Sequence, residues 1–450
     1  MKITKRGNQK TKRSPTQIIA ITFCAIILAG TILLALPAAS KDRVSAGVFN
    51  ALFTATSATC VTGLVVFDTA TQWSAFGQTV IITLIELGGL GFMSAASLVV
   101  FLFRRKVGLR QRMVMAQALS VDDMNSVVKL QKWVIFGSLG IQLIGALVLM
   151  VRFLPEHGFA RAAAWGAFHA ISAFCNAGFD IFGTGQSLVT LNHDPVVLIV
   201  LMVLITVGGL GFFVWEEVVR LRRFRKFSVY TKLVLLMTGI LMVGGAAVIL
   251  LLEWNNPETL GTMGVGQKVL NAFFQSVTLR TAGFAAVDQG ALTAAGKGVS
   301  MVLMLIGGAS GSTAGGVKVV TFLVLLLFIW NRARGRSHVN VFRRSIPSGK
   351  VLDAMTIVAL VTGLAVVGAV LICATSPIGF TDALYETVSA LATVGLTTGV
   401  TTGLSVLGKL LIIIFMYFGR VGVLTISLGF LMGDRAEERF RYAYTNLLIG

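Results

Sequence analysis

Long apolar runs alternate with short polar connectors along most of the chain. A transmembrane helix needs roughly 20 consecutive apolar residues, and eight segments fit that requirement, at approximately residues 18–36, 76–103, 132–152, 194–219, 232–252, 298–330, 354–374 and 406–432. Between the two members of each pair lies a shorter, moderately apolar stretch, at about residues 46–60, 162–175, 267–280 and 381–393. At about 1.5 Å per residue, these stretches cannot cross a hydrocarbon core of roughly 30 Å. The pattern predicts an all-α polytopic membrane protein with eight transmembrane helices and four short re-entrant helices.

The four short stretches share a pattern that identifies an internal repeat. Each is followed by a glycine, at intervals of 115, 105 and 112 residues: Gly63, Gly178, Gly283 and Gly395. An aromatic residue stands ten positions before each glycine: Phe53, Phe168, Phe273 and Tyr385. Ser-Ala lies six and five positions before three of the glycines, and a Gly-x-x-Gly motif follows all four, at Gly88/Gly91, Gly208/Gly211, Gly308/Gly311 and Gly419/Gly422. Each repeat is therefore predicted to consist of a helix, a short pore helix, a loop and a second helix.

Two spans return the chain to the side on which it began, so the four repeats are predicted to run parallel. Inverted-repeat transporters require antiparallel halves, whereas parallel repeats favour a pseudo-fourfold arrangement around a central cation pore. The expected divisions are an N-terminal tail, four repeats and a C-terminal tail, at residues 1–17, 18–112, 113–231, 232–350, 351–433 and 434–450.

Composition and charge support a membrane protein and explain its basicity. Of its 450 residues, 55% are hydrophobic and 13% are charged, against about 25% charged in an ordinary soluble domain. The net charge is +19, but 28 of the 38 Lys and Arg lie in the N-terminal tail and in the connectors at 104–132, 220–232, 332–350 and 435–441. Lys and Arg mark cytoplasmic loops. Both termini are therefore expected in the cytoplasm, and the lipid bilayer rather than nucleic acid is the expected partner.

The loops after the short helices carry the candidate chemistry. Non-helical backbone at membrane depth must be covered by protein or line a watery cavity. Rings of backbone carbonyls can replace a cation's hydration shell, glycine permits the backbone geometry, and the negative C-terminal ends of helices favour cations. The predicted filter residues are Thr59, Cys60, Val61, Thr62, Gly63, Asn176, Ala177, Gly178, Thr281, Ala282, Gly283, Thr393, Val394 and Gly395. The alternative is that these glycines only allow close helix packing.

Nearby acidic residues do not suggest a carboxylate filter. When the four repeats are aligned on their glycines, the acidic residues near the loops do not align with one another: Asp68, Asp180, Asp288 and Glu386. A carbonyl cage therefore fits better than a calcium-type site. The four cysteines are scattered, without metal-ligand or CxxC spacing, so neither a structural metal nor a disulfide is expected.

A glycine-rich segment is predicted to interrupt the second helix of the third repeat. Five glycines in ten residues cannot form a firm helix. The segment is predicted to act as a gate, and comprises Gly307, Gly308, Ala309, Ser310, Gly311, Ser312, Thr313, Ala314, Gly315 and Gly316, followed by Lys318. A simple kink that eases packing is the alternative.

Two arginines lie within apolar or pore segments. Arg420 is in the last span, where a charge is costly and usually faces the interior. It is predicted to be an electrostatic barrier to cations, with a purely structural arginine as the alternative. Arg280 is expected to stabilise the negative end of its pore helix and to pair with Glu386.

These residues give the chain a family resemblance along nearly its whole length. It resembles the Trk/Ktr/HKT potassium transporter superfamily, and most closely its KtrB-type membrane subunits. The motifs are Thr59-Cys60-Val61-Thr62-Gly63-Leu64, Phe174-Cys175-Asn176-Ala177-Gly178-Phe179, Arg280-Thr281-Ala282-Gly283-Phe284, Thr393-Val394-Gly395-Leu396 and Gly419-Arg420. The resemblance implies four fused two-helix channel units, a K⁺ filter at the four glycines, a gating loop at 307–316 and a pore arginine at Arg420. Glycine rather than serine at position 63 favours potassium within this superfamily.

The resemblance also implies partners. It implies that the chain forms a homodimer in the bacterial cell membrane. It also implies that this homodimer binds a cytosolic, KtrA-like RCK subunit. The nucleotide (ATP, ADP or NAD) is then expected on that subunit alone, and this chain has neither a Walker A motif nor a GxGxxG that opens a soluble βαβ unit. The C-terminal segment 434–450 would contribute to the dimer.

Two other classes of function, another cation transporter and an enzyme, can be compared with the residues present. A sodium or low-selectivity monovalent cation transporter remains the alternative, and sodium dependence stays open. An enzyme is not expected, because the sequence has no Ser/His, paired-Asp or HExxH constellation, and its histidines are dispersed at His157, His169, His193 and His338.

Overall fold

The computed structural model describes residues 15–91, 127–183, 185–336, 338–342 and 344–422. The described chain is helical apart from one two-stranded antiparallel hairpin, β1 (Val339–Val341) and β2 (Arg344–Ile346). Its helices are α1 (Pro15–Ala35), α2 (Val48–Thr59), α3 (Thr69–Gln72), α4 (Ala75–Gly89), α7 (Val127–Cys175), α8 (Pro195–Gly209), α9 (Phe212–Leu221), α10 (Val229–Glu253), α11 (Val265–Thr278), α12 (Ala294–Leu305), α13 (Val319–Ala333), α14 (Ser348–Thr375), α15 (Phe380–Ala392) and α16 (Val406–Val421). Short 3₁₀ turns occur at η1 (Pro37–Ala39), η2 (Val189–Leu191), η3 (Phe224–Lys226) and η4 (Thr401–Gly403).

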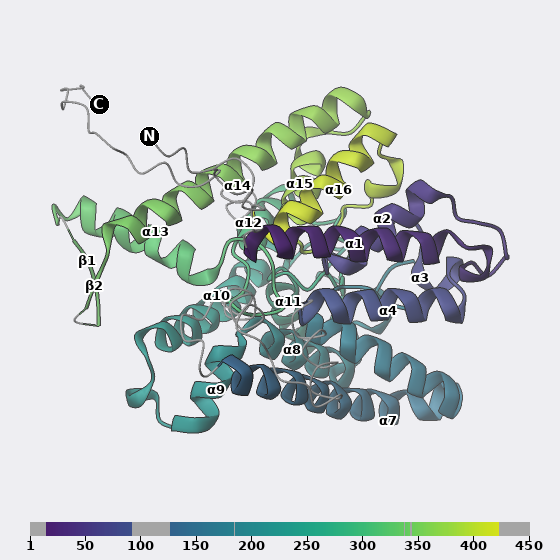
Figure 1. The fold of residues 1–450 in the computed structure, drawn as a ribbon, viewed down its shortest axis with the longest axis horizontal. Helices are drawn as coiled ribbons and strands as arrows, with labels where there is room; N and C mark the ends of the chain where they lie inside the picture. The colour runs from purple at the N-terminus through teal and green to yellow at the C-terminus, as the bar shows by residue number, and fades with distance from the viewer. Residues whose placement is uncertain (1–14, 92–126, 184, 337, 343, 423–450) are drawn as a thin grey trace, which may run out of the picture.

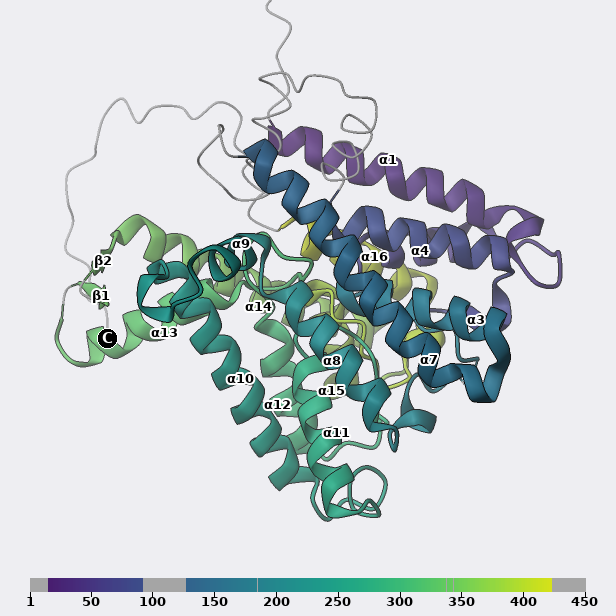
Figure 2. The same cartoon turned by 90° about the horizontal axis from the view of Figure 1, so that it is seen from below.

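The helices gather in groups around a set of central loops. Figure 1 shows α7 and α8 on the opposite side of these loops from α14–α16. Figure 2 shows α1 and α4 opposite α10–α12. The hairpin lies at the end of α13, at one extreme of the molecule (Figure 1). The short helices α2, α11 and α15 form where the sequence predicted them.

The predicted transmembrane helices are only partly continuous. Within the described residues, α1, α7, α10 and α14 are long and apolar enough to cross a membrane. The second spans of the first and fourth repeats, predicted at 76–103 and 406–432, begin as α4 and α16, and their remaining parts lie outside the described residues. The first span and the pore helix of the second repeat form one merged helix, α7, with a break at Gly158, where φ is 72°.

The span predicted at 194–219 is wrong as a single helix. It divides into α8 and α9, which are bent by 97°. The break falls at Gly211, where φ is 90°, a value that glycine adopts at little steric cost. The interruption predicted in the third repeat is confirmed, because α12 ends at Leu305 and α13 begins at Val319.

The Gly-x-x-Gly motifs supply both non-helical backbone and packing surfaces. Their second glycines all have positive φ: 82° at Gly91, 90° at Gly211, 67° at Gly311 and 96° at Gly422. In three repeats, a Cβ on the first glycine would collide with the backbone carbonyl four residues before the filter glycine: Gly88 against Thr59, Gly208 against Phe174 and Gly419 against Leu391. The motif therefore allows the second helix of these repeats to approach the end of its own pore helix.

Candidate functional site

Each pore helix ends in the same backbone turn. Two positions before each aligned glycine, a non-glycine residue has positive φ: 56° at Val61, 60° at Asn176, 69° at Thr281 and 51° at Thr393. The glycines follow with φ of 99°, 68°, 83° and 92° at Gly63, Gly178, Gly283 and Gly395. Positive φ is uncommon outside glycine, and in a β-branched residue it marks real strain. The repetition of a strained turn at four matched positions indicates a shared function.

Hydroxyl groups of the pore helices hold these turns in place. The Ser-Ala matches place Ser57 and Ser389 so that their Oγ atoms accept hydrogen bonds from the N–H groups of Gly63 (3.1 Å) and Gly395 (3.0 Å). In the other two repeats a hydroxyl donates to the carbonyl that follows the glycine: Ser172 to Phe179 and Thr278 to Phe284, both at 2.7 Å. The sequence showed the serine pattern, but its role in fixing the loop appears only in the structure.

The four glycines meet in a closed ring. A Cβ on any of them would collide with the carbonyl oxygen of the residue just before the next glycine: Gly63 with Ala177, Gly178 with Ala282, Gly283 with Val394 and Gly395 with Thr62. The first two of these separations would be 2.5 and 2.7 Å. Because only glycine lacks a Cβ, each repeat needs it for its loop to reach the neighbouring carbonyl.

The predicted filter residues are brought together and withdrawn from the molecular surface. All fourteen are buried. Within the described chain, the carbonyls of Thr62, Ala177, Ala282 and Val394 accept no hydrogen bond, and the hydroxyls of Thr59, Thr62 and Thr393 also have no partner. Unpaired polar groups at this depth cost free energy unless water or an ion satisfies them. The arrangement can therefore replace part of a cation's hydration shell.

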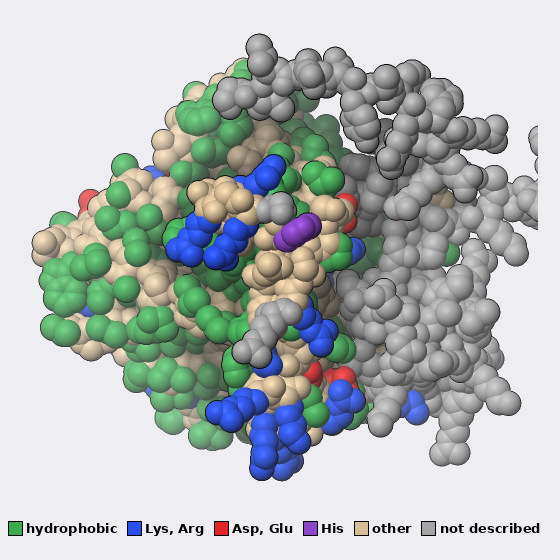
Figure 3. Space-filling view, turned by 90° about the vertical axis from the view of Figure 1, so that its left-hand side faces the viewer, with side chains coloured by type: hydrophobic (Ala, Val, Ile, Leu, Met, Phe, Trp, Pro, Cys, Tyr) green, Lys and Arg blue, Asp and Glu red, His purple; other side chains and the backbone are tan. Residues whose placement is uncertain are grey.

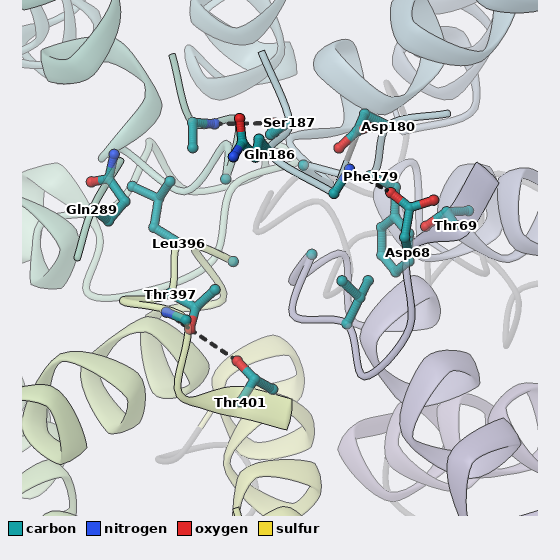
Figure 4. A pocket seen from close by; sticks show the side chains of 18 of the residues that line it. Asp68, Thr69, Phe179, Asp180, Gln186, Ser187, Gln289, Leu396, Thr397 and Thr401 are labelled. Carbon is teal, nitrogen blue, oxygen red and sulfur yellow. Dashed lines mark hydrogen bonds between the residues drawn. The ribbon is translucent and has the colours of Figure 1, made fainter. Parts of the chain in front are cut away.

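A cavity of about 620 Å³ opens on one side of the ring, and all four glycines line it. Three carboxylates, of Asp68, Asp180 and Asp288, share this lining. Figure 4 shows Asp68 and Asp180 near one another at its wall. The Asp68 carboxylate accepts a hydrogen bond from the N–H of Gly185 at 3.1 Å. The cavity therefore presents negative charge to whatever approaches the ring from this side.

The prediction that none of the acidic residues near the loops align between repeats is wrong for one pair. Asp68 and Asp288 each lie five residues after their glycine, so they do align, and that spacing was a signal that could have placed both at the cavity. Glu386 lies elsewhere: it is fully buried and accepts a hydrogen bond from the Thr401 hydroxyl. The predicted pairing of Arg280 with Glu386 is also wrong, because a guanidinium nitrogen of Arg280 instead lies 3.4 Å from the Thr238 hydroxyl.

The glycine-rich segment lies against the ends of the pore helices. Its two ends are joined by a hydrogen bond from the Gly307 N–H to the Val317 carbonyl at 2.9 Å. At its centre, the Thr313 hydroxyl donates to the carbonyl of Phe174 at 3.1 Å, near the end of α7. A Cβ on Gly315 would collide with the Thr393 hydroxyl. The segment therefore lies against the ends of α7 and α15, next to the loops that carry Gly178 and Gly395.

Arg420 and Lys318 both contact this segment or its surroundings. The guanidinium of Arg420 donates to the carbonyls of Thr313, Gly88 and Gly89, the last at 2.9 Å. The Lys318 ammonium donates to the carbonyl of Ala314 at 2.7 Å. Arg420 thus faces the interior, as predicted for a charge at this depth, and it joins the glycine-rich segment to the end of α4.

Comparisons with known proteins agree with this geometry. The family model of TrkH, described as a cation transport protein, matches residues 1–439. The chain is 40% identical over 455 residues to the potassium/sodium uptake protein NtpJ of Enterococcus hirae, covering 100% of both chains. It is also 40% identical over 429 residues to the Ktr system potassium uptake protein B of Bacillus subtilis, covering 95% of each.

The fold is shared with a solved structure. The crystal structure of the potassium transporter TrkH from Vibrio parahaemolyticus matches with a TM-score of 0.74 at 17% sequence identity, covering 95% of this chain and 86% of that one. The resemblance inferred from the filter motifs is confirmed. The chain belongs to the TrkH family of cation transport proteins, and it is a multi-pass membrane transporter rather than an enzyme.

Proposed function

We propose that this chain forms the pore of a potassium uptake system. Four parallel repeats, at residues 18–112, 113–231, 232–350 and 351–433, surround a pseudo-fourfold axis, and the fourteen filter residues select K⁺ on that axis. The ring in which each filter glycine abuts the next repeat's carbonyl carries this proposal. A cyclic set of carbonyls without hydrogen bonds is the arrangement that a dehydrated potassium ion requires.

The segment 307–316 is proposed as the gate. It lies directly beneath the filter loops. Its contacts are made by the short side chain of Thr313, which donates to the Phe174 carbonyl, and by the Thr313 carbonyl, which accepts from Arg420. Such contacts can be exchanged without unfolding a helix. Arg420 adds a positive charge beside the ion path, so it can oppose cation passage while the gate is closed.

The orientation and the assembly follow from charge and from the relatives. Figure 3 shows Lys and Arg side chains gathered on the face that carries the hairpin, and we assign this face and both termini to the cytoplasm. We propose that a homodimer docks there on a cytosolic RCK-domain subunit that carries the nucleotide. The name of the Bacillus relative, a protein B of a Ktr system, supports a complex with further subunits.

Sodium permeation is the second candidate function. The Enterococcus relative, which matches over its full length, is named a potassium/sodium uptake protein. Sodium could be a coupled ion or a second substrate. The resemblance to the Trk/Ktr/HKT superfamily implies that glycine rather than serine at position 63 favours potassium as the ion selected by the filter.

The proposed function is tested by ion uptake in cells. A bacterium that lacks its potassium uptake systems should grow at low external potassium when it produces this chain together with a candidate RCK subunit. Rubidium uptake should be inhibited by potassium more strongly than by sodium. Growth failure with well-produced protein and every partner tested would contradict potassium uptake. Equal inhibition of rubidium uptake by sodium would contradict potassium selectivity.

The uptake should depend on external pH through Asp180. Burial of this carboxyl in the connector after the second filter loop, together with the like charge of Asp68, raises its pKa from 3.8 to about 7. Above that pH it is ionised and attracts cations, and below it the charge is lost. One charge at a wet pore mouth changes a cation's free energy by about 0.5 kcal/mol, so uptake at subsaturating potassium should fall about twofold between pH 8 and pH 6.

The matched variants are Asp180→Asn and Asp288→Asn. At both pH values, Asp180→Asn should have the low uptake that the wild type shows at pH 6, so it should have no pH dependence over this range. The second removes a charge from the same cavity but should leave the dependence in place. A wild-type pH profile in Asp180→Asn would contradict the assignment.

A further inference from the structure

A second cavity lies on the basic face of the molecule, away from the filter. Its volume is about 820 Å³, within the roughly 300–1,000 Å³ typical of ligand pockets. It lies among α10, α13, α14 and the hairpin, with Phe213 of α9 also in its wall. Apolar side chains make up most of its lining: Phe213, Val229, Leu233, Val320, Val324, Val341, Ile346, Pro347, Ala354 and Ile357. The cavity therefore suits a hydrocarbon chain over much of its surface.

The floor of this cavity is part of the proposed gate. Ser310 lines it together with Tyr230, and the Tyr230 hydroxyl donates to the Ser310 carbonyl at 3.2 Å. The next residue, Gly311, accepts a hydrogen bond from the Phe212 N–H at 2.9 Å. An occupant of the cavity would therefore contact the segment that lies beneath the filter.

The charged residues of the lining come from β2 and the first turns of α14. Arg344 and Lys350 are exposed, and neither makes an ion pair or a side-chain hydrogen bond within the described part of the chain. Asp353 is the one carboxylate among the lining residues, so two cations face one anion. Lys and Arg are also abundant on the face that surrounds the hairpin (Figure 3). The cavity thus combines an apolar wall with an excess of positive charge.

We propose that this cavity binds an anionic phospholipid of the cytoplasmic leaflet. The phosphate lies between Arg344 and Lys350, and an acyl chain follows the apolar wall towards Ser310. The assignment to the cytoplasmic leaflet rests on the orientation given under the proposed function. Basic residues at a membrane surface attract anionic headgroups, and the acyl chain gains from burial of its methylene groups. A nucleotide or a polar peptide would leave most of the apolar side chains of this wall without apolar groups to pack against.

A bound lipid would stabilise the present position of the gate. A ligand shifts a conformational equilibrium only through different affinities for the two states. Here the cavity is formed jointly by α10, α13 and Ser310, so displacement of the glycine-rich segment would change its floor. The lipid therefore favours the arrangement in which Ser310 and Tyr230 remain hydrogen-bonded.

Lipid binding can be tested without measuring transport, which separates this proposal from the proposed function. The full-length protein, purified in detergent and freed of lipid, would be titrated with dioleoyl phosphatidylglycerol or dioleoyl phosphatidylcholine and examined by native mass spectrometry. Phosphatidylglycerol should bind about tenfold more tightly, since each basic residue near a headgroup contributes a substantial attraction. Equal binding of the two lipids would overturn the proposal.

Two kinds of variant locate the binding site. The double variant Arg344→Gln/Lys350→Gln should lose about tenfold in phosphatidylglycerol affinity, whereas Arg223→Gln/Arg225→Gln, which removes the same charge from exposed residues outside the lining, should bind as the wild type does. Ala354→Phe narrows the cavity without changing charge, and should weaken both lipids. Each variant is compared only as a monodisperse protein on size exclusion. Equal losses in both double variants would overturn the site, as would competition by glycerol 1-phosphate as effective as that of the intact lipid.

Discussion

Gly395→Ser protein should lose at least about a hundredfold of its rubidium uptake, while Gly399→Ser protein keeps most of it. The two glycines have nearly identical φ values, 92° and 91°. A side chain therefore imposes a similar backbone strain at both, of the order of 1–3 kcal/mol. At Gly395 the added Cβ would also collide with the Thr62 carbonyl of another repeat, whereas at Gly399 nothing lies within 4 Å. If the ring is the filter proposed above, displacement of this carbonyl changes the ion site itself.

The comparison isolates the filter from general strain. Uptake of rubidium and its inhibition by sodium would be measured for both proteins at equal membrane abundance. We expect the residual uptake of Gly395→Ser to be less selective against sodium, because a distorted carbonyl ring no longer matches one ion size. If both variants lost uptake equally, strain alone would explain the loss. Wild-type uptake by Gly395→Ser would exclude this glycine from the filter.

Arg420→Ala should raise uptake in the absence of any regulatory subunit by about tenfold or more. Its guanidinium donates to the carbonyls of Thr313, Gly88 and Gly89, and a hydrogen bond from a charged group contributes about 1.5–3 kcal/mol. Loss of even one such bond from the closed state shifts the gate equilibrium about tenfold. The measurement is rubidium flux into proteoliposomes that contain this chain alone.

Arg420→Lys distinguishes the two roles that the side chain could have. Lysine keeps the positive charge but lacks the planar fork that reaches several carbonyls at once. Flux in Arg420→Lys as high as in Arg420→Ala would identify a tether for the glycine-rich segment. Flux as low as in the wild type would identify an electrostatic barrier. No increase in Arg420→Ala would contradict both roles.

Much of the site was predictable because its signals are local and occur four times. The aligned glycines, the serines six positions earlier and the Gly-x-x-Gly motifs each lie within one repeat. A turn that must adopt positive φ at Gly63 needs a glycine there in every copy. Apolar runs of known length likewise predicted the long helices, and the five glycines between 307 and 316 predicted the break between α12 and α13.

Other features depended on contacts between segments that the sequence does not relate. The acceptor partners of Arg420, in Thr313 and Gly88, are 107 and 332 residues away. Charge alone predicted that Arg280 pairs with Glu386, but its observed partner is the Thr238 hydroxyl. A threonine hydroxyl leaves no distinctive pattern in the sequence that would identify it as this partner. The 97° bend at Gly211 was missed because α8 and α9 together read as one apolar run.

The sequence by itself determined the long apolar helices α1, α10 and α14, the repeated glycine motif and the position of the glycine-rich break between α12 and α13, because each follows from local hydrophobicity or backbone freedom. Only the tertiary structure decided which glycine abuts which carbonyl, which acids gather at the cavity above the ring and which backbone groups Arg420 holds. These arrangements arise where loops more than a hundred residues apart pack within van der Waals distance, and the free energy of that packing depends on shapes that no single segment encodes.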